Sequence, residues 1–323
     1  MCEEVLTQSD LESGDVLLVR GKSRFSRWIQ RLDGTEVSHA ALVISDGMIA
    51  EATGDGVATK TLADELHAPQ LEYAVVARAD PAAHAIAAVL QRADGFLAEH
   101  RRYAFERLLL LAVLLLTRRI PFNARGKVVA RRLLEAASQN LVSIVEPDSP
   151  CPMICSEFVH RCYGGNLEIE GLRLAEGLFE QFEDGDRHLP MDSLWELARQ
   201  QAATDGLMEP SPDDSDASAD LQALTPEQLM EIDPAELVEE DPDASAGGLS
   251  GDLLTAIGEF ASALGETAKR FPEHFAVPEV PESLIDMQLA ERLAACTPLV
   301  TSFVTPGDLL RSPSLSRIGR MLP

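Results

Sequence analysis

Short runs of apolar and β-branched residues dominate the beginning of the chain. They are separated by turns rich in glycine or aspartate, and each run is shorter than an ordinary helix. We expect strands at 15–19, 40–44, 48–52, 57–61 and 73–78. Because turns this short join neighbouring antiparallel strands, the pattern predicts one antiparallel sheet over residues 14–78.

Helical spacing of apolar residues follows the predicted sheet. Asp80-Pro81 is typical of a helix start, so we expect an alanine-rich helix from this point to about residue 100. The same spacing predicts further helices over 106–118, 126–145, 155–163, 249–270 and 281–296. Strands that come first and helices that follow are typical of the α+β class, in which an antiparallel sheet packs on helices.

The composition is that of a globular protein with an acidic surface. Of the 323 residues, 46% are hydrophobic and 25% are charged, which excludes a wholly disordered chain. The 53 aspartates and glutamates outnumber the 27 lysines and arginines and give a net charge of −26. Because a surface of this sign repels the phosphate backbone, we expect no nucleic-acid partner.

The sequence pattern lacks the signals for secretion and for a disulfide framework. Met1-Cys2-Glu3-Glu4 has no basic residues and no apolar run behind it, so we expect no signal peptide. The longest apolar run, Leu108–Leu116, has nine residues, about half of a membrane span. Five cysteines are too few for a disulfide framework. We therefore expect a soluble protein made in the cytoplasm, and export by a route without a signal peptide stays open.

Cys155 lies where helix geometry favours a reactive thiol. Prolines precede it, and Phe158, Val159 and Cys162 follow with the spacing of an apolar helix face, which puts Cys155 in the first turn. Unpaired amides and the positive end of the helix dipole favour a thiolate there. Such a cysteine is a nucleophile when a histidine is near, and is otherwise a small buried residue. The spacing of its neighbouring cysteines and His160 matches no zinc motif, so we expect no metal.

A histidine and a glutamate flank the second predicted hairpin. His39 begins one strand, Glu51 lies near the end of the next, and Ser45 is midway between them. A turn of three or five residues centred on Ser45 would place the two side chains opposite each other, with Cβ atoms roughly 5 Å apart. The carboxylate could then hold the imidazole in one tautomer, as in a catalytic triad. A two-residue Asp46-Gly47 turn would instead pair Glu51 with Leu42 and separate them.

These two elements carry a resemblance to a known group of enzymes. The strand motif HAALVISDGMIAE (39–51), followed far downstream by PMICSEFVHRCY (152–163), resembles the circularly permuted NlpC-type papain-like hydrolases, the bacterial permuted amidases. In that group the histidine precedes the nucleophilic cysteine. The chain is also similar to lecithin:retinol acyltransferase-like acyl hydrolases, which carry a second histidine where this chain has Glu51.

The resemblance implies a fold, a domain layout and a set of site residues. It implies a permuted papain-like domain over 1–200, completed by 301–323 through the segment TPGDLLRSP (305–313), with 201–300 as an acidic, partly disordered and helical insertion. Cys155 is the expected nucleophile, His39 its base and Glu51 the residue that orients the base. Tyr103 matches a tyrosine that lines the group's active site, although Tyr103-Ala104 replaces the usual Tyr-Asp or Tyr-Asn pair. No cofactor is implied.

The substrate stays open between two chemistries of the same fold, with a third function from another class. The chain could be a thiol acyl hydrolase or acyltransferase that acts on an acyl ester or amide, such as a membrane lipid in a phospholipase-like reaction. It could be an amidase or thiol protease that cleaves peptide, such as cell-wall peptide. The third alternative is a catalytically inactive binding module. Reaction of Cys155 with a thiol probe separates the enzymes from the binding module.

Charge is distributed unevenly along the chain. The segment Arg101–Arg132 has nine basic residues and one acidic residue around Leu108–Leu116, which suits an anionic membrane surface. Alternatively, the leucines form a buried core helix. Residues 205–248, the acidic arm, have fourteen acidic residues and no basic one. We expect this arm to cover part of the Arg101–Arg132 surface or to recruit a protein partner, unless it serves only solubility.

Overall fold

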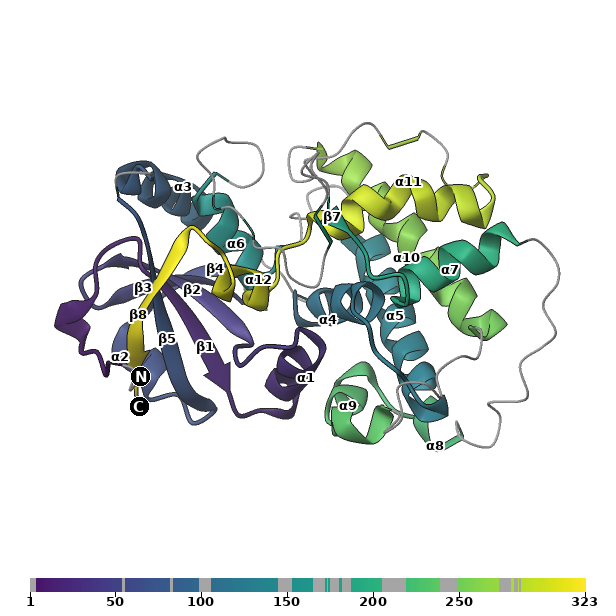
Figure 1. Cartoon of the computed structure of the whole chain (residues 1–323), viewed down its shortest axis with the longest axis horizontal. Coiled ribbons are helices and arrows are strands. Elements are labelled where there is room, and N and C mark those ends of the chain that lie inside the picture. Colours follow the sequence, from purple (N-terminus) through teal and green to yellow (C-terminus); the bar gives the residue numbers. More distant parts are fainter. Residues whose placement is uncertain are drawn as a thin grey trace. The chain divides into compact units, whose positions relative to one another are not determined.

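The computed structural model divides the chain into two compact units (Figure 1). It describes residues 4–53, 56–81, 84–98, 106–144, 153–164, 172, 174, 180–181, 187–204, 219–238, 249–272, 280–281, 284 and 286–323. The sheet unit consists of residues 1–107, 152–177 and 304–323. The helical unit consists of residues 108–151 and 178–303.

A six-stranded antiparallel sheet forms the centre of the sheet unit. Its strands are β1 (Val16–Gly21), β2 (His39–Ser45), β3 (Met48–Thr53), β4 (Gly56–Thr61), β5 (Leu71–Ala79) and β8 (Leu315–Met321). They lie in the order β4-β3-β2-β1-β5-β8 (Figure 1). The five strands predicted from the apolar runs are all present, and the mixed helix and sheet content confirms the α+β class.

Both faces of the central strands β1, β2, β3 and β5 are largely buried, which explains why these strands are mostly apolar. One face packs against α3 (Ile86–Ala98) and α6 (Cys155–Cys162), where Leu18 and Leu42 meet Phe158. The other face is covered by η1 (Gln8–Asp10), α2 (Leu62–Leu66) and their flanking residues. The predicted packing of the Cys155 helix on the sheet is therefore confirmed.

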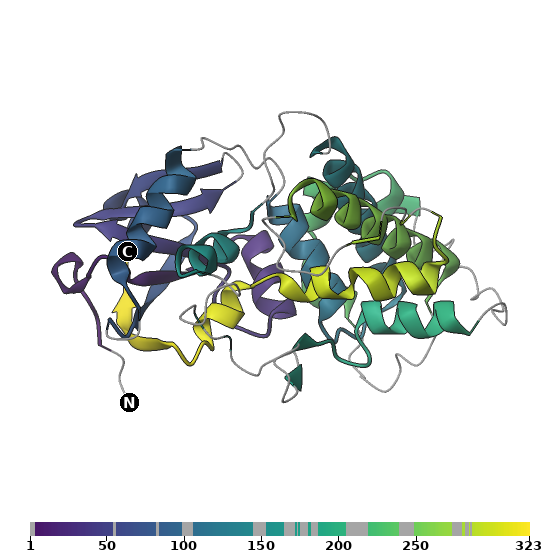
Figure 2. The same cartoon turned by 90° about the horizontal axis from the view of Figure 1, so that it is seen from above.

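The segment after residue 303 returns to the sheet unit, as predicted. It forms α12 (Pro306–Leu310) and then β8, which pairs with β5 at the edge of the sheet. Asp33, at the end of α1 (Arg24–Leu32), is fully buried and accepts hydrogen bonds from the Thr305 hydroxyl at 2.9 Å and the Gly307 amide at 2.7 Å. In Figures 1 and 2, α12 lies beside α6. The C-terminal segment is therefore fixed next to the helix that carries Cys155.

The helical unit is built around three long helices. Helix α10 (Gly251–Arg270) packs along α5 (Ala124–Ile144) and against α11 (Leu289–Ser302). The remaining elements are α4 (Glu106–Thr117), β6 (Glu180–Gln181), β7 (Arg187–His188), α7 (Leu194–Ala203), α8 (Ala219–Gln222), α9 (Pro226–Met230) and η3 (Pro234–Leu237). No helix among the described residues is long and apolar enough to cross a membrane.

The division between the units differs from the predicted boundary at residue 200. Residues 108–151 and 178–200, which we assigned to the first domain, group with the helical unit. The physical reason is the apolar run: all of Leu108–Leu116 is buried, no residue of it more than 6% exposed. The run is therefore a core helix, and the alternative in which these leucines meet a lipid surface is wrong.

The bounds of two predicted helices need correction, and other helices were not predicted. Helix α3 begins at Ile86 and not at Pro81, although the His84 amide makes one helix-like hydrogen bond to the Asp80 carbonyl at 3.0 Å. Helix α11 runs over 289–302 rather than 281–296 and contains Pro298 in its interior. Helices α1, α2 and α7 were not predicted. Of these, α1 does have apolar residues at helical spacing, Phe25, Trp28, Ile29 and Leu32, so its sequence contained a signal for a helix.

The described part of the acidic arm lies on helix α5. Arg125 pairs with Asp220 at 3.2 Å, and Arg132 donates hydrogen bonds to the carbonyls of Gln222 and Leu224. Leucines 221, 229 and 237 of the same segment are buried. The prediction that the arm covers part of the basic segment is confirmed for residues 219–238, and the rest of the arm lies outside the described residues.

Candidate functional site

Cys155 is the first residue of α6 and is buried. The residues one to two turns further along, Phe158, Val159 and Cys162, pack on the sheet and fix the helix. The Ser156 hydroxyl donates a hydrogen bond of 2.6 Å to the Val304 carbonyl, which ties the first turn to the segment before α12. The prediction that Cys155 starts a helix is confirmed, and its sulfur stands where the helix dipole favours a negative charge.

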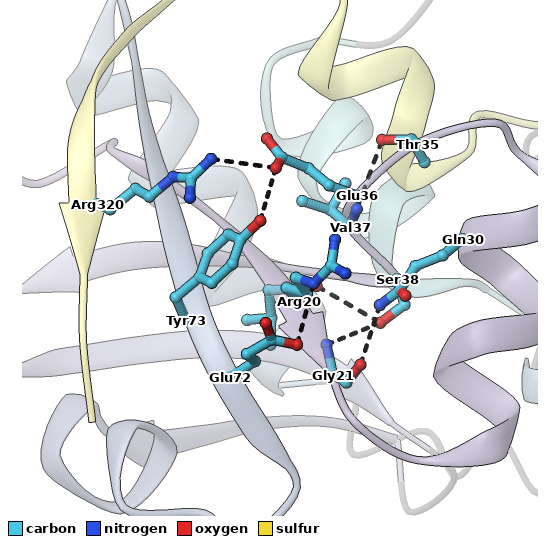
Figure 3. Close-up of polar contacts among 11 residues, drawn as sticks. Arg20, Gly21, Gln30, Thr35, Glu36, Val37, Ser38, Glu72, Tyr73 and Arg320 are labelled. Atoms are coloured by element: carbon cyan, nitrogen blue, oxygen red, sulfur yellow. Dashed lines mark hydrogen bonds and ion pairs between the residues drawn. The ribbon is translucent and has the colours of Figure 1, made fainter. Parts of the chain in front are cut away.

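His39 is the first residue of β2, and the chain before it is held at several points. The Ser38 amide bonds to the Val19 carbonyl at 2.8 Å, and His39 itself is in register with Val19. Figure 3 shows the contacts of the preceding residues. There the Tyr73 hydroxyl donates to Glu36 at 2.6 Å, and the Ser38 hydroxyl accepts from the Gly21 amide at 3.3 Å. The backbone of His39 is therefore fixed by β1 and by the residues that precede it.

Glu51 reaches His39 directly. The Oε2 atom of Glu51 lies 2.6 Å from Nε2 of His39, and the glutamate side chain is 9% exposed. This contact was predicted from the sequence. Because Glu51 occupies Nε2, the other ring nitrogen, Nδ1, is left for a second partner.

The turn that produces this contact is not the predicted one. The turn is the two-residue Asp46-Gly47, with Gly47 at a φ of 68°. Ser45 pairs with Met48 but Val43 pairs with Ile49, so Ile44 is an extra residue, a β-bulge. The bulge shifts the register by one and restores the face that a regular two-residue hairpin would have lost. The prediction of a three- or five-residue turn that sets His39 directly opposite Glu51 is therefore wrong. The register makes the two residues diagonal neighbours on one face, and they still make contact.

The second partner of the His39 ring is Cys155, with which it forms a hydrogen bond. Burial of the ring opposes a positive charge. The negative charge and hydrogen bond of Cys155, followed by those of Glu51, nevertheless raise the pKa of His39 well above its ordinary value of 6.5. The same attraction favours a thiolate on Cys155. The arrangement is a cysteine–imidazole pair with a carboxylate behind it.

Lys60 and Glu65 extend this arrangement and were missed by the sequence analysis. Lys60 Nζ on β4 lies 3.9 Å from Oε1 of Glu51 and makes an ion pair with Glu65 at the end of α2. Burial alone would raise the pKa of Glu51, but the His39 hydrogen bond and charge, and then the Lys60 charge, bring that pKa below its ordinary value. The only signal for this contact in the sequence was Lys60 in the predicted strand 57–61, which follows the strand that contains Glu51.

The remaining candidate residues are distributed as follows. Cys162 is buried in the core, as predicted, and burial raises the pKa of its thiol far above its ordinary value. Burial also raises the pKa of Cys296 to about 12. Tyr103 and Cys151 lie outside the described residues. Among the described residues no group of histidine, cysteine and carboxylate side chains is arranged to hold a metal ion.

No protein-family model matches the chain, and no curated protein matches it in sequence. The chemistry of the site therefore has to be argued from its own geometry.

Proposed function

We propose that the chain is a cysteine hydrolase or acyltransferase, with Cys155 as nucleophile, His39 as acid and base, and Glu51 as the residue that orients His39. The observation that carries this proposal is the contact series in which one imidazole touches Cys155 on one side and a buried carboxylate on the other. A nucleophile, a base within hydrogen-bond reach and a third group that orients the base form the general pattern of covalent acyl-transfer catalysis.

The first half-reaction forms a thioester. The thiolate of Cys155 attacks the carbonyl carbon of an ester or amide, and the electrons of the C=O bond move to the oxygen. The Cys155 amide at the start of α6 is placed to stabilise this oxyanion. The C–O or C–N bond then breaks, and the imidazolium of His39 gives its proton to the leaving alcohol or amine.

The second half-reaction regenerates the enzyme. Neutral His39 removes a proton from water, or from an acceptor alcohol or amine, as that group attacks the thioester carbon. The C–S bond breaks and the acid, or the new ester or amide, is released. The thiolate returns with an imidazolium beside it. Glu51 transfers no proton in this scheme, because its role is to hold the ring and balance its charge.

The substrate class is an acyl ester or amide, in the lipid or in the peptide form. The buried position of the leucine run removes one argument for a lipid surface but leaves the basic residues of Arg101–Arg132. A panel of phospholipids and cell-wall peptides, assayed with the wild-type protein and Cys155→Ser, distinguishes the two. Turnover of one class that disappears in the variant identifies the substrate.

The first prediction concerns the reactivity of Cys155. Iodoacetamide should alkylate Cys155 of the folded protein at pH 6 at least about tenfold faster than Cys162 or Cys296, because an adjacent imidazolium favours the thiolate. All three cysteines are buried, so the two others are internal controls. The measurement is peptide mass spectrometry over time, with Cys155→Ser identifying the peptide.

The variant His39→Ala completes this test. It should slow the alkylation of Cys155 by about tenfold or more at pH 6 and leave that of Cys162 and Cys296 unchanged. Equal and slow alkylation of the three cysteines in the wild-type protein would contradict the proposed function. That outcome would favour the inactive binding module instead.

A further inference from the structure

The carboxylate of Glu51 has two oxygens, and each faces a different cation. Oε2 lies 2.6 Å from His39, and Oε1 lies 3.9 Å from Nζ of Lys60. Lys60 comes from β4, the neighbour of β3, where it is in register with Ile49, two residues before Glu51. It therefore reaches the carboxylate diagonally across the strand pair, on the side away from His39.

Lys60 is itself held by a second carboxylate. Its ammonium group makes an ion pair with Glu65, whose side chain is 8% exposed. Burial disfavours the charge on Lys60, but the hydrogen bond and charge of Glu65, and then Glu51 and Asp64, raise the pKa of the lysine. Charges therefore alternate from Cys155 through His39, Glu51 and Lys60 to Glu65.

This order of charges solves a physical problem at the site. A buried carboxylate with one neighbour can rotate about its last bond or take up a proton, and either change removes the support of the imidazolium. A cation at the second oxygen disfavours both changes. The groups around Lys60 are Glu51 on β3 and Glu65 and Asp64 on α2, and those beyond Glu51 are His39 on β2 and Cys155 on α6.

We propose that Lys60 is a positioning residue that acts through Glu51: it holds the Oε1 atom so that Oε2 stays ionised and directed at Nε2 of His39. Glu65 anchors Lys60 in that place. This inference rests on the proposed function for its catalytic meaning, but the geometry it describes can be measured without turnover.

The test compares Lys60→Gln, Lys60→Arg and the wild-type full-length protein in the alkylation of Cys155 from pH 4.5 to 9. Without the cation, Glu51 should take up a proton at higher pH. The acid limb of the profile in Lys60→Gln should then move up by about half to one pH unit. On the acid limb, below the pKa, this shift amounts to a loss of about three- to tenfold, and the change becomes small at pH 7.5. Lys60→Arg, which keeps the charge, should restore the profile.

Lys22→Gln is the matched control, because Lys22 is an exposed lysine of the same unit. It should leave the profile unchanged. If Lys60→Gln lowers the rate by the same factor at every pH, or only lowers the melting temperature, Lys60 is a structural residue and the proposal is wrong. A pH profile of Lys60→Gln that matches the wild-type profile would also show that the proposal is wrong.

A second measurement separates this inference from the proposed function. Carbon NMR of the Glu51 carboxyl group follows its titration directly, whether or not Cys155 is reactive. Its pKa should rise in Lys60→Gln and return in Lys60→Arg. If Cys155 proves unreactive but this shift is observed, the proposed function fails and the positioning of Glu51 stands. If the Glu51 pKa does not change, the positioning role fails by itself.

Discussion

His39 is a largely buried ring whose partners decide its charge. Burial alone would keep the ring neutral, so its charged form depends on Cys155 and Glu51. Because its pKa in the folded protein is raised above 6.5, the charged ring stabilises the fold below that pH. This contribution is lost as the pH rises through the raised pKa. The charge of the His39 side chain thus depends on its own burial and on Cys155 and Glu51.

Removing either partner should therefore lower the pKa of His39. Cys155 and Glu51 both raise the pKa of the ring, so Cys155→Ser and Glu51→Gln should each lower it. Histidine NMR of the three proteins measures both changes. No effect of Cys155→Ser would show that the ring and Cys155 are not in contact in solution.

Glu51→Gln also has a defined consequence for turnover. The amide keeps a hydrogen-bond acceptor for the ring but loses the charge that supports the imidazolium. We expect weak residual activity on the substrate that the panel identifies, whereas Cys155→Ser and His39→Ala should have none.

At the level of elements, the sequence predicts strands better than it predicts how they connect. Five runs of apolar residues were enough to place β1 to β5, because a sheet covered on both faces needs apolar side chains at nearly every position. The bulge at Ile44 could not be predicted, since this residue is as suited to a regular strand as to a bulge. The contact between His39 and Glu51 was nevertheless predicted, because both residues belong to one predicted hairpin, the motif of residues 39–51.

The site itself was predictable only in part, for a related reason. Cys155, His39 and Glu51 are residue types with known chemistry at a characteristic spacing. Lys60 and Glu65 are ordinary charged residues on β4 and α2, and only the register of the sheet shows that they meet Glu51. Long-range pairing of this kind has no signature within a short stretch of sequence.

A further prediction concerns how α1 is joined to α12. Asp33→Ala would leave the buried hydroxyl of Thr305 and the amide of Gly307 without their acceptor. The expected loss is about 2–4 kcal/mol of the free energy of unfolding, and Asp33→Asn, which keeps one acceptor oxygen, should lose less.

The two tryptophans make this loss measurable unit by unit. Trp28 is buried in the sheet unit and Trp195 in the helical unit. In urea titrations, the fluorescence of Trp28 in a Trp195→Phe background should show the lower midpoint of Asp33→Ala. The midpoint reported by the fluorescence of Trp195 in a Trp28→Phe background should be the same with and without Asp33→Ala. Equal shifts of both signals would show that the two units unfold together.

At the scale of the whole molecule, the uneven charge has become a set of ion pairs within the helical unit. Arg119 pairs with Asp192, Arg125 with Asp220 and Arg131 with Asp252. The basic residues that would suit an anionic membrane are thus partly neutralised by the protein's own carboxylates. Exposed pairs of this kind are individually weak, so a charged surface can compete for the arginines.

Neutralising the three aspartates tests whether they restrain membrane binding. The triple variant Asp192→Asn, Asp220→Asn and Asp252→Asn should bind vesicles of anionic phospholipid at least about fivefold more tightly at low salt, and the gain should shrink as salt is added. A control variant that neutralises Asp10, Asp46 and Asp64 of the sheet unit changes the net charge equally. The same gain in both variants would mean that only net charge matters, and no gain would mean that these three aspartates do not restrain membrane binding.

The route of the chain through the two units also sets the order in which the molecule can mature during synthesis. The sheet unit begins with residues 1–107, but it is complete only when residues 304–323 have been synthesised, about 200 residues later. At ordinary elongation rates this interval lasts roughly 10–40 s. During it, β5 has an uncovered edge where β8 will pair, and α6 has no Val304 or α12 beside it. A nascent chain therefore carries both His39 and Cys155 well before β8 and α12 complete the unit around them.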